Sequence, residues 1–124
     1  MEPINKLRLR LRLATSHGIV IGPGRADLLA LIAQTGSIAA AGRQMKMSYR
    51  RAWTLVEAMN NSFISPLVET SKGGAGRGGA KLTPLGEDVL AAYRDLETLT
   101  QHAGTTQFAF FESVLAPETI AKPN

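Results

Sequence analysis

The chain has 124 residues, enough for one domain with a buried core and too few for two. Its composition, 44% hydrophobic and 19% charged, is that of an ordinary globular protein and excludes both disorder and a bilayer-spanning segment. There is no cysteine, which excludes disulfides and thiolate metal sites and fits a reducing compartment. Because the N-terminus also lacks the apolar core of a signal peptide, a cytoplasmic location is predicted.

Positive charge is concentrated in the first half of the chain. Residues 1–51 hold nine Lys and Arg against two acidic residues, whereas residues 52–124 hold five against eight. The net charge is +4 and the isoelectric point is near 9.9. This asymmetry favours a basic face turned toward an anionic partner, with nucleic acid as the first candidate and a merely solvated surface as the alternative.

The N-terminal residues 6–13 read KLRLRLRL, in which leucine alternates with lysine or arginine. Successive side chains of a strand point to opposite faces, so a half-buried strand with one leucine face and one cationic face is predicted. His17 and Gly18 then supply a turn, and residues 19–21 a short return strand. The cationic face is interpreted either as a solvated outer face, which is favoured, or as a phosphate contact.

Three helical segments are predicted between residues 25 and 61. Apolar residues recur at helical spacing from Arg25, and Thr35-Gly36 ends this first run with a C-cap glycine. Ser37 is a good N-cap for a short, alanine-rich helix over residues 38–45. Ser48 caps a third helix, which extends to about residue 61.

A two-stranded ribbon and a long helix are predicted to follow. Residues 67–70 and 81–83 read as strands on either side of a glycine-rich loop. Thr83-Pro84 is an N-cap followed by a proline at the first helical position, and the helix that it starts runs to about residue 102. Residues 1–104 are therefore assigned to one domain. Residues 105–124 form a tail with three phenylalanines, a candidate for association with a dimer.

This order of elements describes a winged helix-turn-helix, an α+β fold that is mainly α with little β. In that fold the third helix lies in the DNA major groove and presents its N-terminal turn to base edges. Arginine can hold guanine with two hydrogen bonds and can also hold phosphate. Two arginines near a helix N-terminus oppose the helix dipole by roughly 0.3–1 kcal/mol each, which favours an anion at this place over a solvated helix start. The residues of the turn are Ser48, Tyr49, Arg50 and Arg51, with Thr54 one turn further on.

Residues 74–79, GAGRGG, match the G-x-G-x-x-G pattern of a dinucleotide-binding turn. That turn requires a helix that opens within the pattern, whereas here a strand follows and the helix starts only at Pro84. No nucleophile elbow, metal-binding motif or closely spaced carboxylate set appears. The sequence therefore predicts no catalytic residue, no metal and no cofactor, so the protein is not expected to be an enzyme. The glycines are interpreted as the tip of the ribbon.

Several blocks resemble the DNA-binding domain of ModE-type molybdate-responsive regulators. They are GSIAAA at residues 36–41, MSYRRAW at 47–53 and EAMN at 57–60. GRGGAKLTPLG at residues 76–86 resembles the wing and the start of the following helix in the same family. The resemblance covers roughly residues 18–100, and the same segments are more distantly similar to the LysR-type winged helix.

The resemblance implies a homodimeric bacterial transcription regulator that binds double-stranded DNA, with the helix after the wing contributing to the dimer. Together with the patterns above, it gives two sets of candidate residues. The candidate DNA contacts are Ser37, Ser48, Tyr49, Arg50, Arg51, Thr54, Lys72, Arg77 and Lys81. The candidate dimer interface is formed by Leu85, Val89, Tyr93, Leu96 and Leu99.

Two features depart from the family pattern. Lys46 occupies a turn position where helix-turn-helix units often have a left-handed glycine; because lysine costs roughly 1 kcal/mol there, a slightly different turn is expected. Full-length ModE-type regulators also carry C-terminal oxyanion-binding domains, and no such domain fits after residue 104. The molybdate response is therefore not carried over. Control by another protein, a ligand at the dimer interface and constitutive binding stay open as alternatives.

A protein-interaction module on a winged-helix scaffold is the alternative function, since such folds do not always bind DNA. The apolar face of residues 85–99 and the phenylalanines would then bind a partner protein, and the arginines would serve solubility. Salt dependence separates the two functions. DNA binding through about six to ten phosphate contacts weakens by roughly 10³–10⁵ between 50 and 200 mM salt, whereas an apolar interaction changes little.

Overall fold

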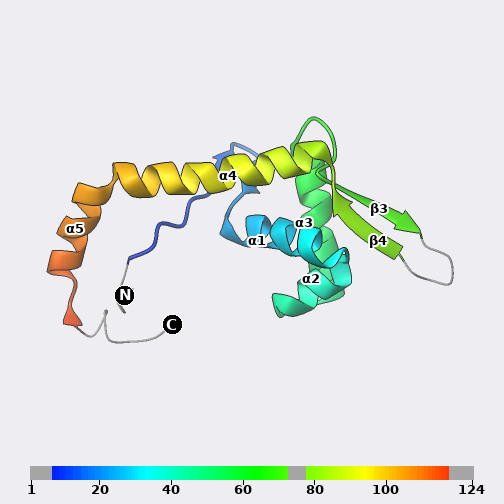
Figure 1. The fold of residues 1–124 in the computed structure, drawn as a ribbon, viewed down its shortest axis with the longest axis horizontal. Helices are drawn as coiled ribbons and strands as arrows, with labels where there is room; N and C mark the ends of the chain where they lie inside the picture. Colours follow the sequence, from blue (N-terminus) through cyan, green and yellow to red (C-terminus); the bar gives the residue numbers. More distant parts are fainter. Residues whose placement is uncertain (1–6, 73–77, 118–124) are drawn as a thin grey trace.

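The computed structural model describes residues 7–72 and 78–117. Figure 1 shows the first three helices gathered beneath a long fourth helix, with a β-ribbon projecting at one end and a fifth helix at the other. This is the predicted winged helix-turn-helix, with a small hairpin before it. In chain order the elements are β1 (Leu13–Thr15), β2 (Gly18–Ile21), α1 (Pro23–Thr35), α2 (Ile38–Gln44), α3 (Tyr49–Ser62), β3 (Val68–Lys72), β4 (Gly78–Leu82), α4 (Pro84–Ala103) and α5 (Thr105–Val114).

The hydrophobic core lies where α1, α2 and α3 meet under α4. Leu28 and Ile32 lie one turn apart on α1 and are fully buried, as is Met59 on α3. Gly42 of α2 faces Ala52 of α3 so closely that a Cβ built on Gly42 would lie 3.0 Å from the Ala52 Cβ. These small residues permit the close helix crossing of the helix-turn-helix.

The helices begin and end at the predicted capping residues. The side-chain oxygens of Ser37, Ser48 and Thr83 each accept a backbone N–H from three residues on, at 3.0, 3.0 and 2.9 Å. At the other end of α1, Gly36 adopts a left-handed φ of 72°, and its N–H donates to the carbonyl of Ile32. Local signals in the sequence therefore determine where the helix-turn-helix segments start and stop.

The turn between α2 and α3 keeps a left-handed backbone at Lys46, where φ is 58°. Lys46 is the single non-glycine residue with a positive φ in the described part of the chain. The expectation of an altered turn at this residue is therefore wrong. Two backbone hydrogen bonds hold the conformation, from the N–H of Lys46 to Arg43 O and from the N–H of Met47 to Gly42 O, both 3.0 Å long.

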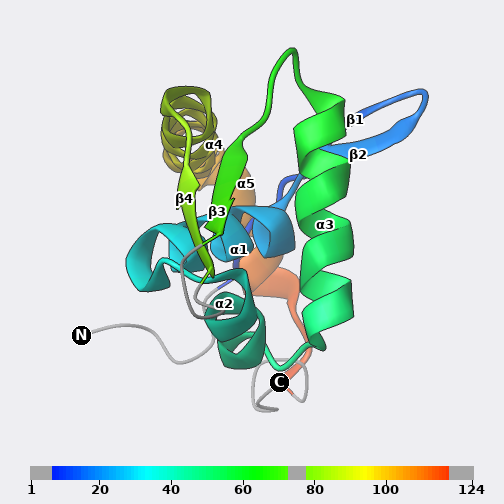
Figure 2. The same cartoon turned by 90° about the vertical axis from the view of Figure 1, so that its right-hand side faces the viewer.

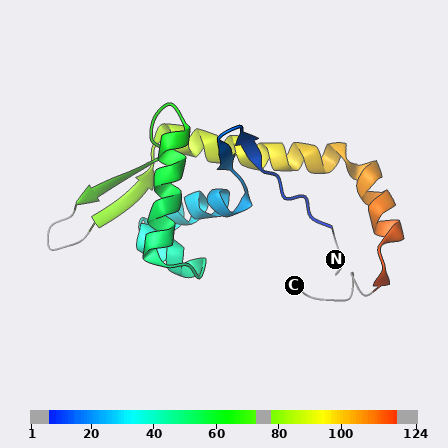
Figure 3. The ribbon, with the colours of Figure 1, turned by 180° about the vertical axis from the view of Figure 1, so that it is seen from behind.

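The predicted strand over residues 6–13 is wrong for most of its length. The ladder with β2 begins only at Leu13, where its register shifts. Residues 7–12, which we call the arm, have no strand pairing and extend beneath α4 instead (Figure 3). The predicted alternation persists, because the leucines at 7, 9 and 11 are half-buried while the arginines at 8, 10 and 12 are exposed. A helix, not a second strand, covers the leucine face.

The side chain of Tyr93 lies inside the protomer, although it was expected in the dimer interface. It is 2% exposed, and its hydroxyl donates a 2.7 Å hydrogen bond to the carbonyl of Leu11 in the arm. Burial and then the nearby Glu97 carboxylate raise the pKa of Tyr93. A raised native pKa contributes stability that is complete below the ordinary value of about 10 and is lost as pH rises through the native pKa. Because the ring is buried within the protomer, it offers no free surface to a second chain.

The start of α4 is fixed against the segment that joins α3 to β3. Asn60 on α3 accepts the N–H groups of Leu67 and Val68 at 2.8 and 3.1 Å and donates to Val68 O at 3.1 Å. Gly86 in the first turn of α4 lies directly on the Leu67 backbone, and a Cβ built there would overlap the Leu67 carbonyl. The orientation of α4 therefore depends on glycine at this position.

Replacing Gly86 by alanine should lower the free energy of unfolding by about 1–3 kcal/mol, because the new methyl group displaces the Leu67 backbone. The matched control is Gly24→Ala, which lies in the first turn of α1 with nothing within 4 Å of its Cβ position. That variant should be neutral or more stable by about 0.5 kcal/mol, since alanine favours helix. Urea denaturation of both variants measures the difference, and equal stabilities would contradict the backbone contact.

Replacing Lys46 by glycine should raise the free energy of unfolding by up to about 1 kcal/mol, because glycine removes the left-handed strain. Lys46→Ala removes the charge and the long side chain but keeps a Cβ at positive φ, so its stability should stay near that of the parent. Thermal or urea denaturation distinguishes the two. A stabilisation of the alanine variant equal to that of the glycine variant would assign the effect to the charge.

Candidate nucleic-acid interface

The first turn of α3 presents an exposed cationic surface. Ala52, Val56 and Met59 form the buried face of this helix, which leaves Arg50 and Arg51 exposed on its outer side. In the described part of the chain, no carboxylate forms an ion pair with either arginine. Two unpaired guanidinium groups at a helix N-terminus, beside free backbone N–H groups, make a surface suited to phosphate or to the acceptor edge of guanine.

The hydroxyl groups of this region are partly occupied by the protein itself. Thr54 Oγ1 donates to Arg50 O at 3.0 Å, so Thr54 turns its methyl group and an acceptor oxygen outward. Ser37 and Ser48 cap α2 and α3, so the oxygen of each already accepts one backbone N–H. The three hydroxyls are therefore structural groups at the edge of the surface, and the strong donors within it are the arginines.

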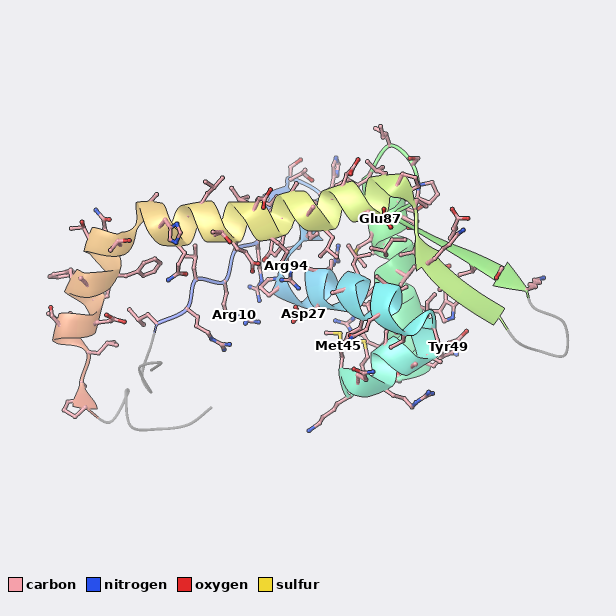
Figure 4. All side chains as sticks on the ribbon, viewed as in Figure 1. Arg10, Asp27, Met45, Tyr49, Glu87 and Arg94 are labelled. Atoms are coloured by element: carbon pink, nitrogen blue, oxygen red, sulfur yellow. The ribbon has the colours of Figure 1, made fainter. Side chains whose placement is uncertain are left out.

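We call the β3–β4 ribbon the wing. A groove of about 480 Å³ separates it from α3. Tyr49, with its side chain 57% exposed, meets Trp53 edge-to-face with ring centroids 6.1 Å apart. Trp53 itself packs against the core. Across the groove lie Thr70 and Lys72 of β3. Figure 2 shows α3 standing beside the wing, and Figure 4 places Tyr49 at the end of α3 that borders α2.

The register of the wing separates its two described lysines. The strands are longer than predicted at the tip, and Lys72 lies opposite Gly78 while Lys81 lies opposite Glu69. Because strand side chains alternate, Lys72 shares a face with Thr70, toward α3, whereas Lys81 shares the other face with Glu69. The structure thus places Lys72 at the groove that Tyr49 of α3 also lines and leaves Lys81 on the opposite face of the wing. Arg77, also a predicted contact, lies outside the described residues.

Sequence reasoning left Arg43 and Lys46 out of the site. Both are exposed, and Lys46 lies two residues before the Ser48 cap, so it extends the cationic surface toward α2. The signal was present in the excess of basic residues before residue 52. What the sequence could not show was that the left-handed turn leaves this lysine exposed beside α3.

Other kinds of site receive no support from the described residues. Within residues 7–72 and 78–117, no three His, Asp or Glu side chains are grouped so that they could hold a metal ion. None of the helices in these ranges is both long and apolar enough to span a bilayer.

No family model matches the chain, but comparison with curated proteins gives several relatives. The molybdenum-pterin-binding protein MopB of Rhodobacter capsulatus is 49% identical over 80 residues, which cover 64% of this chain and 30% of MopB. The transcriptional regulator ModE of Haemophilus influenzae is 40% identical over 93 residues, 75% of this chain and 36% of that protein. The DNA-binding transcriptional dual regulator ModE of Escherichia coli is 36% identical over 93 residues, with the same two shares.

The chain thus spans about a third of the length of the curated relatives that it matches. The similarity covers most of this chain and agrees with the resemblance seen in the sequence blocks. By sequence, this chain is related to regulators of the ModE family, and it corresponds to about a third of the length of each of these relatives.

Proposed function

We propose that the chain binds double-stranded DNA sequence-specifically and acts as a homodimer in transcription regulation of the ModE type. The observation that carries the proposal is the pair of exposed arginines in the first turn of α3, which form no ion pair with any carboxylate of residues 7–72 and 78–117. Relatives that are named transcriptional regulators support it. An exposed cation pair at a helix N-terminus is unfavourable unless an anion binds there, and DNA supplies one at each nucleotide.

In this proposal α3 enters the major groove with its N-terminal turn first. Arg50 and Arg51 contact guanine edges or the flanking phosphates, and Tyr49 and Ser48 lie beside the backbone of the same groove. The wing follows on one side, where Lys72 faces the phosphates across the groove from Tyr49. Arg77 is proposed to contact the adjacent minor groove or its phosphates.

The dimer is proposed to form through α4. Leu85, Val89, Leu96 and Leu99 recur at spacings of three, four and seven, and Leu99 is 66% exposed. Val89 and Leu96 also border an apolar hollow of about 210 Å³ beside the β1–β2 hairpin. A two-fold axis across this face would bury the same residues of both protomers against each other.

The molybdenum in the names of several relatives belongs to proteins about three times as long as this chain. The proposal is therefore limited to DNA binding and regulation, and it includes no effector.

Arg50→Ala should weaken binding to the operator by about 1–3 kcal/mol if this arginine contacts a base. Arg50→Lys is the informative partner, because lysine keeps the charge but loses the two-pronged donor geometry. It should retain affinity for random-sequence duplex and lose part of its preference for the operator. The operator is first obtained by selecting bound genomic fragments. Gel-shift titrations in which Arg50→Ala and Arg51→Ala both bind like the parent would contradict the role of α3.

Leu99→Glu should convert the dimer to a monomer, because it places a charge within the proposed α4 contact. Ile64→Glu is the matched control, since Ile64 is a 97% exposed apolar residue in the loop before β3 and is not among the proposed α4 contacts. Light scattering at micromolar concentration should give a dimer mass for the parent and for the control. A monomer mass for the parent would reject the dimer.

A further inference from the structure

The arm carries a row of cations in a fixed orientation. Its leucines are half-buried and its three arginines are exposed. The hydrogen bond from the Tyr93 hydroxyl to Leu11 O holds the arm in register against α4. In an extended chain, alternate residues lie roughly 6.6 Å apart, so the three guanidinium groups form a regular row that can follow a polyphosphate strand.

Two carboxylates near the arm, those of Asp27 and Glu97, already form ion pairs with Arg94. Arg94 of α4 holds Asp27 at 2.9 Å and Glu97 at 3.2 Å. Arg8 borders a shallow hollow together with Glu97 and His102. Within the described residues, however, no ion pair joins an arm arginine to a carboxylate. The arm therefore keeps three positive charges that the described part of the chain does not neutralise.

The position of the arm determines on which side of the molecule these charges lie. The arm lies beneath α4, on the same side as α1, α2 and the first turn of α3 (Figure 1). In Figure 4, Arg10 extends from the arm away from α4, on the side of that helix where Asp27, Met45 and Tyr49 also lie. The wing projects from α3 in the opposite direction along the molecule. A duplex that engages the first turn of α3 would therefore have the wing on one side and the arm on the other.

We propose that Arg8, Arg10 and Arg12 bind the phosphate backbone of the DNA duplex that α3 contacts, on the side of α3 opposite the wing. The inference rests on the proposed DNA binding and adds a second, sequence-independent contact to it. Phosphate contacts of this kind fix the orientation of a protein on the duplex and leave the choice of sequence to the helix in the groove.

The test uses the full chain, a random-sequence duplex of about 30 bp, and dissociation constants between about 50 and 200 mM salt. Three variants are compared with the parent: Arg8→Gln/Arg10→Gln/Arg12→Gln, the same three positions changed to lysine, and a charge-matched control. The control is Gln34→Glu/Ser65→Glu/Thr106→Glu, at exposed sites outside the arm, which lowers the net charge by the same amount.

The slope of log K against log salt concentration should become shallower in the glutamine variant, by about 0.9 for each phosphate contact removed. If all three arginines bind, the change is about 2.7 per protomer. The lysine variant and the charge-matched control should keep the slope of the parent. A glutamine variant whose slope equals that of the control overturns the inference. If the parent binds duplex, and Arg50→Ala weakens it, the proposed function stands without the arm. If the parent binds no DNA at all, both proposals fail.

A second measurement does not depend on the folding of the glutamine variant. Phenylglyoxal modifies exposed arginines of the parent, and peptide mapping by mass spectrometry locates the modified residues. Bound duplex should protect Arg8, Arg10 and Arg12 as it protects Arg50. Unchanged modification of the arm in a complex that protects Arg50 would overturn the inference.

Discussion

The contact between the C-terminal part of α3 and the start of β3 and α4 determines the geometry of the rest of the molecule. Asn60 is bonded to the N–H groups of Leu67 and Val68 and to the carbonyl of Val68, and Gly86 lies against the carbonyl of Leu67. Thr83 adds a 2.8 Å bond from its hydroxyl to Pro66 O. A single stretch of backbone therefore relates α3, the wing and α4 to one another.

Together with two other attachments, this relation fixes the positions of cationic groups that come from distant parts of the chain. The first turn of α3 has its orientation because its inner face is packed and its far end is bonded through Asn60. The wing is tied at its other strand to the end of α1, since the N–H of Ala80 donates to Gly36 O at 2.9 Å. The arm is attached to α4 through Tyr93. Three separate attachments thus place the wing, the α3 turn and the arm relative to the same core.

The sequence predicted the elements that depend on local signals. Ser37, Ser48 and Thr83 are capping residues whose partners lie three residues away, so the helix starts could be found without knowledge of the fold. The strand over residues 6–13 was predicted wrongly because alternation reports which side chains share a face and does not identify the partner that covers that face. Here the partner is α4, and strand pairing begins only at Leu13.

The same limit applies to the functional residues. Helical spacing put Tyr93 on the apolar face of α4, but only the position of the arm shows that the ring belongs to the core. In the sequence nothing distinguishes Lys72 from Lys81 as a contact. The strand register, in which Lys81 lies opposite Glu69, places them on opposite faces of the wing. The phenylalanines after Gly104 gave too short a pattern to predict α5, whose Phe110 and Phe111 meet edge-to-face at 5.5 Å while both remain exposed.

The hydrogen bond between Tyr93 and Leu11 also orders events during folding. It joins residues 82 positions apart, so its formation closes a loop that contains the whole helix-turn-helix and the wing. Closing a loop of this length costs more chain entropy than the local contacts of a single helix or hairpin. During synthesis, the arm leaves the ribosome before α4, and it can take its place only when α4 has emerged. The chain can therefore form α3 while the arm is still unattached.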